Sequence, residues 1–263
     1  MTTFSKKLGQ IINNKKLGSS ELVRKLNELF WSYRKNKQFI EKSIPVIKKE
    51  LKHFTVVENY IKELNSIISS KNEEKLNKFL GNYSKIEIDK YEKIFSKLIE
   101  QIPRASNVIT ISRSGTVLNV LKLWYGKNKK LKVTVCESRP KYEGKFFAQD
   151  LIKNRIKVEF ITDAMMGLFM QKVDAAIVGA DSVLKNGNVI NKTGSKSLAL
   201  LCKEYKKPFY VVTIRSKYSN KKMFKHQKEN PAEVWQKKHK NLNVQNIYFE
   251  EIEKKFITKI VTD

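Results

Sequence analysis

The sequence predicts an α/β protein, with an N-terminal helical domain over residues 1–103 followed by a parallel-sheet domain over residues 104–263. Before Pro103, apolar residues recur at the three- and four-residue spacing of amphipathic helices. After Pro103, short apolar runs alternate with helical patterns, which favours a parallel sheet covered by helices on both faces. Because crossovers between parallel strands are right-handed, the expected sheet domain is Rossmann-like and doubly wound.

Length and composition are those of a globular protein. The 263 residues can bury a substantial core, and a content of 41% hydrophobic and 30% charged residues is unlike that of a disordered chain. No apolar run approaches the ~20 residues that span a bilayer, and the first residues lack the apolar core of a signal peptide. We therefore expect a cytoplasmic protein without a membrane span.

The cysteines and histidines do not form a reactive or metal-binding pattern. Cys136 and Cys202 each lie within an apolar pattern, which predicts buried thiols and no disulfide. The three histidines, His53, His226 and His239, are far apart in the sequence, so we expect no metal site.

The net charge of +27 would attract anionic partners in a salt-dependent way. The lysines are spread along the whole chain, however, and no groove-reading element or aromatic-interleaved basic motif accompanies them. Specific nucleic-acid binding is therefore not expected. A phosphorylated small molecule or RNA-bound translation machinery remains compatible with the charge.

The helical domain is expected to contain four segments, at Leu8–Ile12 and over residues 19–36, 41–70 and 73–100. Ser19, which follows Gly18, opens the second segment with a good helix start. Pro45 is expected near a helix start, where its missing N–H is tolerated.

The sheet domain is expected to contain five successive strands, over residues 107–112, 131–137, 156–161, 173–179 and 208–214. No strand is followed by a G-x-G-x-x-G loop, so no NAD or FAD cofactor is expected. Beyond residue 215, a basic, turn-rich connection has no firm predicted structure, and a short strand and a final element follow it.

The stretch from Ile177 to Ser197 concentrates the polar groups of the predicted sheet edge. Asp181 comes just past the strand 173–179, where ligands bind in open α/β sheets. Asn186-Gly187 predicts a hairpin with a two-residue type I′ turn, which would bring Asn191 and Lys192 back toward Asp181. Thr193-Gly194-Ser195 then opens a helix whose free N–H groups favour a phosphate. Each residue alone also fits a cap, an ordinary hairpin or a solvated lysine, but together they predict a phosphate site beside a carboxylate.

The other strand ends add polar groups to the same edge. Ser112, Arg113 and Ser114 follow the first strand, and Arg139 follows the second. Ser114 equally fits an ordinary N-cap, and Arg139 equally fits an ion pair with Glu137 or Glu143. Both alternatives remain open at the level of sequence.

Several consecutive segments closely resemble the alpha, beta and delta regulatory subunits of translation initiation factor 2B. They are ESRPKYEGKFFAQDL, FITDAMMGLFMQKVDAAIVGADSVLKNGNVINKTG and KPFYVV. The superfamily includes methylthioribose-1-phosphate and ribose-1,5-bisphosphate isomerases, and the resemblance covers residues 105–215 well. In the helical half, GSSELVRKLNEL looks like the family's Gly-led helix that approaches a ligand phosphate, which implies that Gly18 and Ser19 bind ligand. The resemblance also implies a homodimer or higher oligomer.

One departure from the isomerase pattern bears on activity. Where the isomerases have a catalytic cysteine, this sequence has Ser112, and a serine hydroxyl is a far weaker acid than a thiol. The resemblance therefore implies an initiation factor 2B alpha-like protein that binds a phosphorylated sugar or nucleotide, with initiation factor 2 as a candidate partner. An aldose–ketose isomerase with Asp181 as its catalytic residue is the first alternative. A basic, translation-associated scaffold with an empty pocket is the second.

Overall fold

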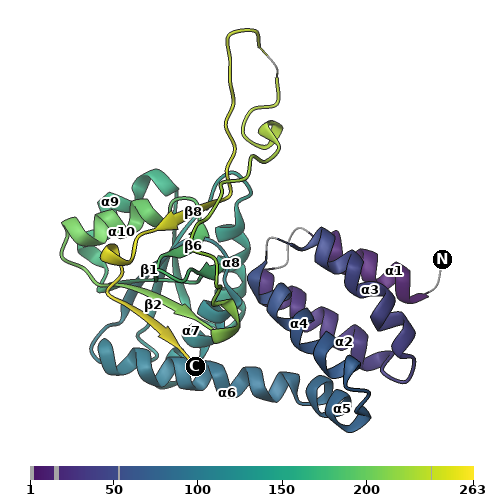
Figure 1. Cartoon of the computed structure of the whole chain (residues 1–263). Coiled ribbons are helices and arrows are strands. Elements are labelled where there is room, and N and C mark those ends of the chain that lie inside the picture. Colours follow the sequence, from purple (N-terminus) through teal and green to yellow (C-terminus); the bar gives the residue numbers. More distant parts are fainter. Residues whose placement is uncertain (1–2, 15–17, 53, 238) are drawn as a thin grey trace.

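The computed structural model describes residues 3–14, 18–52, 54–237 and 239–263, and it confirms the α/β class. A helical lobe lies beside a lobe built around a parallel sheet (Figure 1). The helices of the N-terminal part are α1 Thr3–Ile12, α2 Ser19–Ser32, α3 Lys37–Glu50, α4 Thr55–Ser69, α5 Glu73–Gly81 and α6 Tyr83–Gln101. They are amphipathic, and their apolar faces form one core that includes Leu26, Phe30, Ile61 and Leu64, each almost fully buried.

Two details of the helical half differ from the prediction. Pro45 lies inside α3 and not near its start. Proline has no N–H to donate to the carbonyl of Glu41, one turn earlier. Both residues lie on the exposed face of α3, where water can hydrogen-bond to that carbonyl. The segment 73–100 is two helices, because the chain bends at Asn82, which ends α5 and precedes α6.

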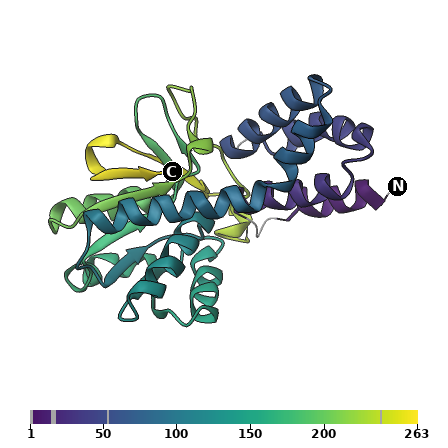
Figure 2. The same cartoon turned by 90° about the horizontal axis from the view of Figure 1, so that it is seen from below.

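Helix α6 connects the two lobes. Its beginning packs on α2 and α5, and the helix then runs along α7 and β9 beneath the sheet (Figure 2). The buried residues of the helical lobe and of one face of the sheet therefore form a single continuous core. The expected division at residue 103 stays a prediction.

The sheet has six parallel strands in the order β3-β2-β1-β4-β7-β9. Their bounds are β1 Asn107–Thr110, β2 Lys132–Cys136, β3 Lys157–Ile161, β4 Ala175–Val178, β7 Phe209–Thr213 and β9 Lys259–Thr262. All five predicted strands are present, and the final predicted element is the sixth. The connecting helices are α7 Gly115–Lys127, α8 Glu143–Lys153, the short α9 Met166–Phe169 between 3-10 turns, and α10 Ser195–Glu204. This is the strand order of a doubly wound fold.

The strands bury both faces. Val108 and Ile177 point to the core shared with α6 and α7, whereas their neighbours Ile109 and Ala176 point to a second core under α10. The alternation follows from the two-residue period of a strand, and it explains why the strands are continuous apolar runs.

A small antiparallel sheet follows β4 at the edge of the main sheet. It contains β5 Ser182–Val183, β6 Val189–Lys192 and β8 Phe249–Ile252, in the order β5-β6-β8. The predicted hairpin is present, but its turn is not type I′, because only Gly187 has a positive φ, +84°. The Gly187 N–H donates to the Leu184 carbonyl, and Leu184 donates to the Asn188 carbonyl, so the connection is a longer one with glycine at its left-handed position.

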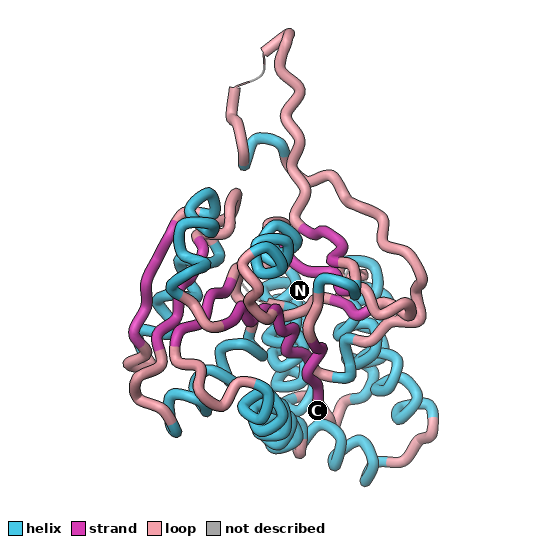
Figure 3. The backbone as a smooth tube through the Cα atoms, turned by 90° about the vertical axis from the view of Figure 1, so that its left-hand side faces the viewer, coloured by secondary structure: helices cyan, strands magenta, loops and turns pink. Residues whose placement is uncertain are grey.

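A long excursion separates β7 from β8. Its first part runs along the hairpin and the helical lobe, where the Lys185 N–H donates to the Lys221 carbonyl and Lys221 forms an ion pair with Glu58 of α4. Residues 228–237 and 239–247, which we call the arm, project away from both lobes and are mostly without regular structure (Figures 1 and 3). The base of the arm is held by a bridge between Lys228 and Ile247 and by a hydrogen bond from the Glu229 N–H to the Asn246 carbonyl. The base lies at the same edge of the sheet as the polar strand ends.

Candidate functional site

A cavity of about 340 Å³, which we call the rim cavity, lies where β1 and β4 end. From β1 the chain continues to β2 on one side, and from β4 it continues to β7 on the other side. The point between β1 and β4 is therefore the topological switch point of the sheet. Its wall comes from the ends of β1 and β4, the hairpin strand β6, the starts of α2 and α7, and the base of the arm. Segments far apart in the sequence therefore meet at one place.

The turn after β1 is held in a fixed conformation. Ser112 has a φ of +70°, a left-handed conformation, and its N–H donates to the Ser138 hydroxyl at 2.7 Å. Ser114 is the N-cap of α7, and its hydroxyl accepts the Val117 N–H. The expected N-cap alternative for Ser114 is thus confirmed, and Ser114 also lines the rim cavity.

Asp181 lines the cavity and follows β4 after Gly179 and Ala180. Its N–H donates to the Ile190 carbonyl of the hairpin, which brings β6 beside it as predicted. Burial raises the pKa of the Asp181 carboxyl, while the nearby Lys217 and Lys192 ammonium groups and a hydrogen bond with Ser19 oppose that rise. The carboxyl therefore lies in a poorly solvated place beside two ammonium groups.

Two buried lysines supply positive charge to the cavity. Lys192 is 3% exposed; its Nζ lies 2.5 Å from Glu143 Oε1 and above the Tyr248 ring. Lys217 is 4% exposed, and its Nζ donates to the Ala180 carbonyl at 2.6 Å. Burial lowers the pKa of Lys217, and the Asp181 carboxylate partly offsets this.

The start of α2 closes the cavity from the helical lobe. Gly18 is the N-cap residue, and as a glycine it has no side chain with which to cap this helix start. Ser20 is buried, and its hydroxyl has no hydrogen-bond partner among the described residues. Glu143 Oε2 is likewise buried without a partner in that part of the chain. Buried polar atoms of this kind are normally satisfied, so the two atoms favour a bound polar ligand.

The cavity wall is mixed in charge. Its charged side chains are Arg113, Lys141, Lys192, Lys217, Glu50, Glu143, Asp181, Glu229 and Glu233. Four cations and five acids do not form a general binding site for polyanions. They suit a ligand whose phosphate pairs with the cationic side chains and whose hydroxyl groups donate hydrogen bonds to the carboxylates.

Most of the predicted ligand residues meet here. Those that line the rim cavity are Gly18, Ser19, Ser112, Arg113, Ser114, Asp181, Asn191 and Lys192. Arg139 and Gly194 do not line it. Arg139 is exposed and stacks on the Tyr142 ring, with neither Glu137 nor Glu143 as its partner.

The start of α10 at Gly194 is already satisfied by a carboxylate. The N–H groups of Gly194 and Lys196 donate to Glu250 Oε1 at 2.7 and 2.8 Å. Glu250 comes from β8 and occupies the position that the sequence predicted for a phosphate. Gly194 itself has a φ of +100°, and a Cβ there would collide with Ile111, so glycine is needed for conformation and packing.

Lys217, Glu143 and Tyr248 are among the wall residues that sequence reasoning missed. Lys217 comes shortly after the fifth predicted strand, so its place at the same edge could have been inferred from strand-end counting. Glu143 and Tyr248 could not, because their positions depend on the start of α8 and on how the arm returns to the sheet.

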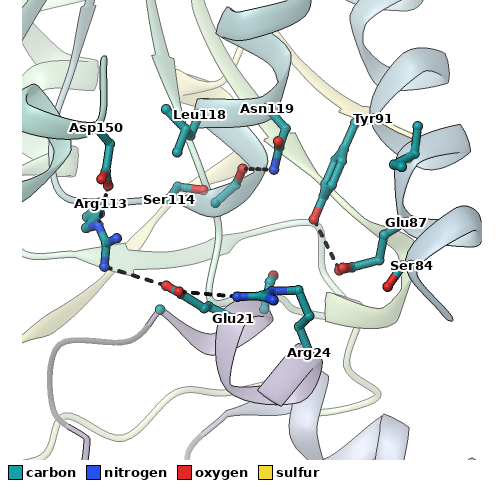
Figure 4. A pocket seen from close by; sticks show the side chains of 14 residues that line it. Glu21, Arg24, Ser84, Glu87, Tyr91, Arg113, Ser114, Leu118, Asn119 and Asp150 are labelled. Carbon is teal, nitrogen blue, oxygen red and sulfur yellow. Dashed lines mark hydrogen bonds and ion pairs between the residues drawn. The ribbon is translucent and has the colours of Figure 1, made fainter. Parts of the chain in front are cut away.

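A second cavity, of about 470 Å³, adjoins the rim cavity (Figure 4). The two share Gly18, Ser20, Arg113, Ser114 and Gly115, so the starts of α2 and α7 stand between them. Glu87 of α6 lies in the second cavity, where the Tyr91 hydroxyl donates to it at 3.1 Å. Burial raises the pKa of Glu87.

Two kinds of site are absent from the described part of the chain. Within residues 3–14, 18–52, 54–237 and 239–263, no cluster of three or more histidine, cysteine or acidic side chains is arranged to hold a metal ion. His53 lies outside these residues. None of the described helices is long and apolar enough to cross a membrane.

The fold and the cavity define a class: a doubly wound α/β protein with a helical lobe and a polar site at the switch point of its sheet. The chain belongs to the initiation factor 2 subunit family, whose profile matches residues 6–263. The resemblance seen in the sequence is thereby confirmed.

Individual relatives agree with this assignment. The solved structure of the translation initiation factor eIF-2B of Pyrococcus horikoshii aligns over all of this chain and 96% of its own, with a TM-score of 0.79 and 26% identity. A Pyrococcus furiosus protein, provisionally named as eIF-2B subunit 2-like, is 38% identical over 156 residues, which are 59% of this chain and 55% of that protein. The ribose 1,5-bisphosphate isomerase of Methanocaldococcus jannaschii is 28% identical over 169 residues, 62% of this chain and 55% of the isomerase. The chain thus spans about half the length of these two curated relatives.

Proposed function

We propose that this chain is an initiation factor 2B alpha-subunit-like protein that binds a phosphorylated sugar or nucleotide in the rim cavity. It would act in the cytoplasm, in translation initiation or its metabolic regulation. The observation that carries the proposal is the meeting of two buried lysines, a partly buried carboxylate and a helix start with glycine at its N-cap in one cavity.

Each group has a role that its surroundings support. Lys192 and Lys217 neutralise phosphate, and the N–H groups at the start of α2 donate to its oxygens. Asp181 accepts sugar hydroxyls, as does the unpaired Glu143 Oε2. Ser112 and Asn191, which also line the cavity, orient the ligand.

Binding without turnover is favoured because no thiol reaches the cavity. Both cysteines are buried and neither is among the residues that line it. Burial raises the pKa of Cys202 to about 12 and also raises that of Cys136. Neither can supply a thiolate at neutral pH, and the Ser112 hydroxyl is a much weaker acid.

The test is thermal unfolding with a panel of pentose phosphates, hexose phosphates and nucleoside monophosphates. A ligand at ~100 times its dissociation constant adds about 2.7 kcal/mol, which raises the midpoint by about 5 °C or more for a chain of this size. Lys192→Met should abolish the rise. Lys196→Met is the matched control, since Lys196 also forms an ion pair, with Glu253 at 3.0 Å, and does not line the cavity.

Other outcomes separate the alternatives. Turnover of ribose 1,5-bisphosphate or methylthioribose 1-phosphate that is lost in Asp181→Asn would make the protein an isomerase. No midpoint rise with any ligand, together with salt-sensitive binding to initiation factor 2, would favour the scaffold. Sedimentation of the full chain would test the proposed homodimer or higher oligomer.

A further inference from the structure

Arg113 lines both cavities. Its guanidinium is paired with carboxylates, as Figure 4 shows for the second cavity. Its Nε donates to Asp150 Oδ2 of α8 at 2.7 Å, and its Nη1 lies 3.6 Å from Glu21 Oε2 of α2. The other oxygen of Glu21 lies 3.6 Å from Arg24. Arg113, which the sequence marked as a ligand residue, is thus the centre of an ionic chain between the two lobes.

The chain of charges lies where the two helix starts touch. Glu21 is in the first turn of α2, and Arg113 directly precedes Ser114, the N-cap of α7. A Cβ on Gly18 would lie 3.6 Å from the Arg113 carbonyl oxygen, so the two starts are already at contact distance. Glu21, Arg113 and Asp150, which we call the clasp, are each about a fifth to a third exposed and lie beside this contact.

We propose that the clasp is a positioning device: it sets the spacing between the starts of α2 and α7, and this spacing, more than the Arg113 guanidinium, determines how tightly an anion binds in the rim cavity. The proposal rests on the function proposed above. Its physical basis is that N–H donors at a helix start hold a phosphate oxygen only within hydrogen-bond distance and direction. If α2 moves away from α7, the donors from one side lose their contact.

The proposal predicts an effect opposite to that of simple electrostatics. Glu21 carries negative charge near a phosphate site, so its neutralisation should strengthen anion binding if charge alone mattered. If the clasp sets the spacing, neutralising Glu21 releases α2 and weakens binding. The sign of the change therefore separates the two accounts.

The experiment measures the affinity of the full chain for inorganic phosphate and for ribose 5-phosphate by titration calorimetry at 25 °C and ~0.1 M salt. Glu21→Gln should bind both about fivefold more weakly, the upper range for part-exposed ion pairs. Glu73→Gln is the matched control: it removes the same charge from an ion pair between α3 and α5, with Lys37 at 2.8 Å, away from both cavities. Its affinity should equal that of the wild type or slightly exceed it.

A double-variant cycle identifies how Arg113 acts. Glu21→Gln with Arg113→Gln should bind no more weakly than Arg113→Gln alone, because both break the same clasp. Arg113→Lys should also weaken binding, since an ammonium cannot reproduce the guanidinium fork between two carboxylates. A merely structural role would lower the ligand-free unfolding midpoint and leave phosphate affinity at 25 °C unchanged.

Each remaining outcome overturns a specific statement. If Glu21→Gln binds phosphate as tightly as the wild type or more tightly, the clasp proposal is wrong, and the proposed function is unaffected. If the losses of phosphate affinity multiply in the double variant, Arg113 contacts the ligand directly, and the clasp proposal is wrong. If the wild type binds neither probe, the proposed function fails, and the clasp proposal fails with it.

Discussion

Gly179 directly follows β4, and because it has no side chain, the turn after β1 can pack against its backbone. A Cβ built at this position would lie 2.7 Å from Ser114 Cβ and closer still to Ser114 Oγ. Ordinary carbon–carbon contacts are about 3.5–4.0 Å, so Gly179→Ala must push Ser114 away. Since Ser114 Oγ accepts the Val117 N–H, the displacement also removes the cap of α7.

The two costs can be added. Loss of the cap costs about 1 kcal/mol, and overpacking costs about 1–3 kcal/mol, so Gly179→Ala should lower the free energy of unfolding by about 2–4 kcal/mol. Urea denaturation at 25 °C measures it. Gly126→Ala is the matched control, because nothing lies within 4 Å of a Cβ there and alanine favours its helix.

A second substitution tests the cause. Ser114→Gly removes both atoms that collide with the new methyl group, and glycine at an N-cap costs only a few tenths of a kcal/mol relative to serine. Gly179→Ala with Ser114→Gly should therefore come within about 1 kcal/mol of the wild type. If the double variant is no more stable than Gly179→Ala, steric contact with Ser114 is not the reason for the glycine.

Two more predictions concern carboxylates. Glu250→Ala removes the acceptor for the N–H groups of Gly194 and Lys196, so urea denaturation should show a free energy of unfolding about 1–2 kcal/mol lower. The control Glu204→Ala, at the opposite end of α10, should be neutral or slightly stabilising. If both variants lose the same free energy of unfolding, Glu250 does not act as a cap. Burial raises the folded pKa of Asp181 above its ordinary value of 3.8, so its favourable contribution is present below that pH and is lost as the pH rises through the folded pKa. Asp181→Asn should therefore raise the unfolding midpoint at pH 7. It should also make the midpoint fall less steeply as the pH rises above ~4. A lower midpoint than that of the wild type at pH 7 would show that the pairing of Asp181 with Lys217 dominates.

The sheet was predictable because its strands are buried on both faces. Each strand therefore reads as an apolar run, and the parallel direction places the ends of β1 and β4 at one edge. For this reason Ser112 and Asp181 were placed together from the sequence alone. The hairpin was predictable from Asn186-Gly187, although not its turn type.

What could not be predicted depends on contacts between distant segments. Gly194 opens a helix as expected, but Glu250, more than fifty residues later, already caps it. Arg113 has the charge for a phosphate, yet its partners come from α2 and α8. The bend at Asn82 depends on how α5 packs in the helical lobe, because the sequence pattern continues through it.

The position of β9 has a consequence for the order of folding. β7 has β4 on one side, and its other neighbour, β9, follows only after the arm and β8. Closing this long loop carries an entropic cost, and non-local parallel pairing forms slowly. The helices of the N-terminal half pack largely on one another and are synthesised first, so we expect them to form before β9 covers its part of α6. Because Lys217 and Tyr248 lie in that same loop, we expect the rim cavity to be completed only in this late step.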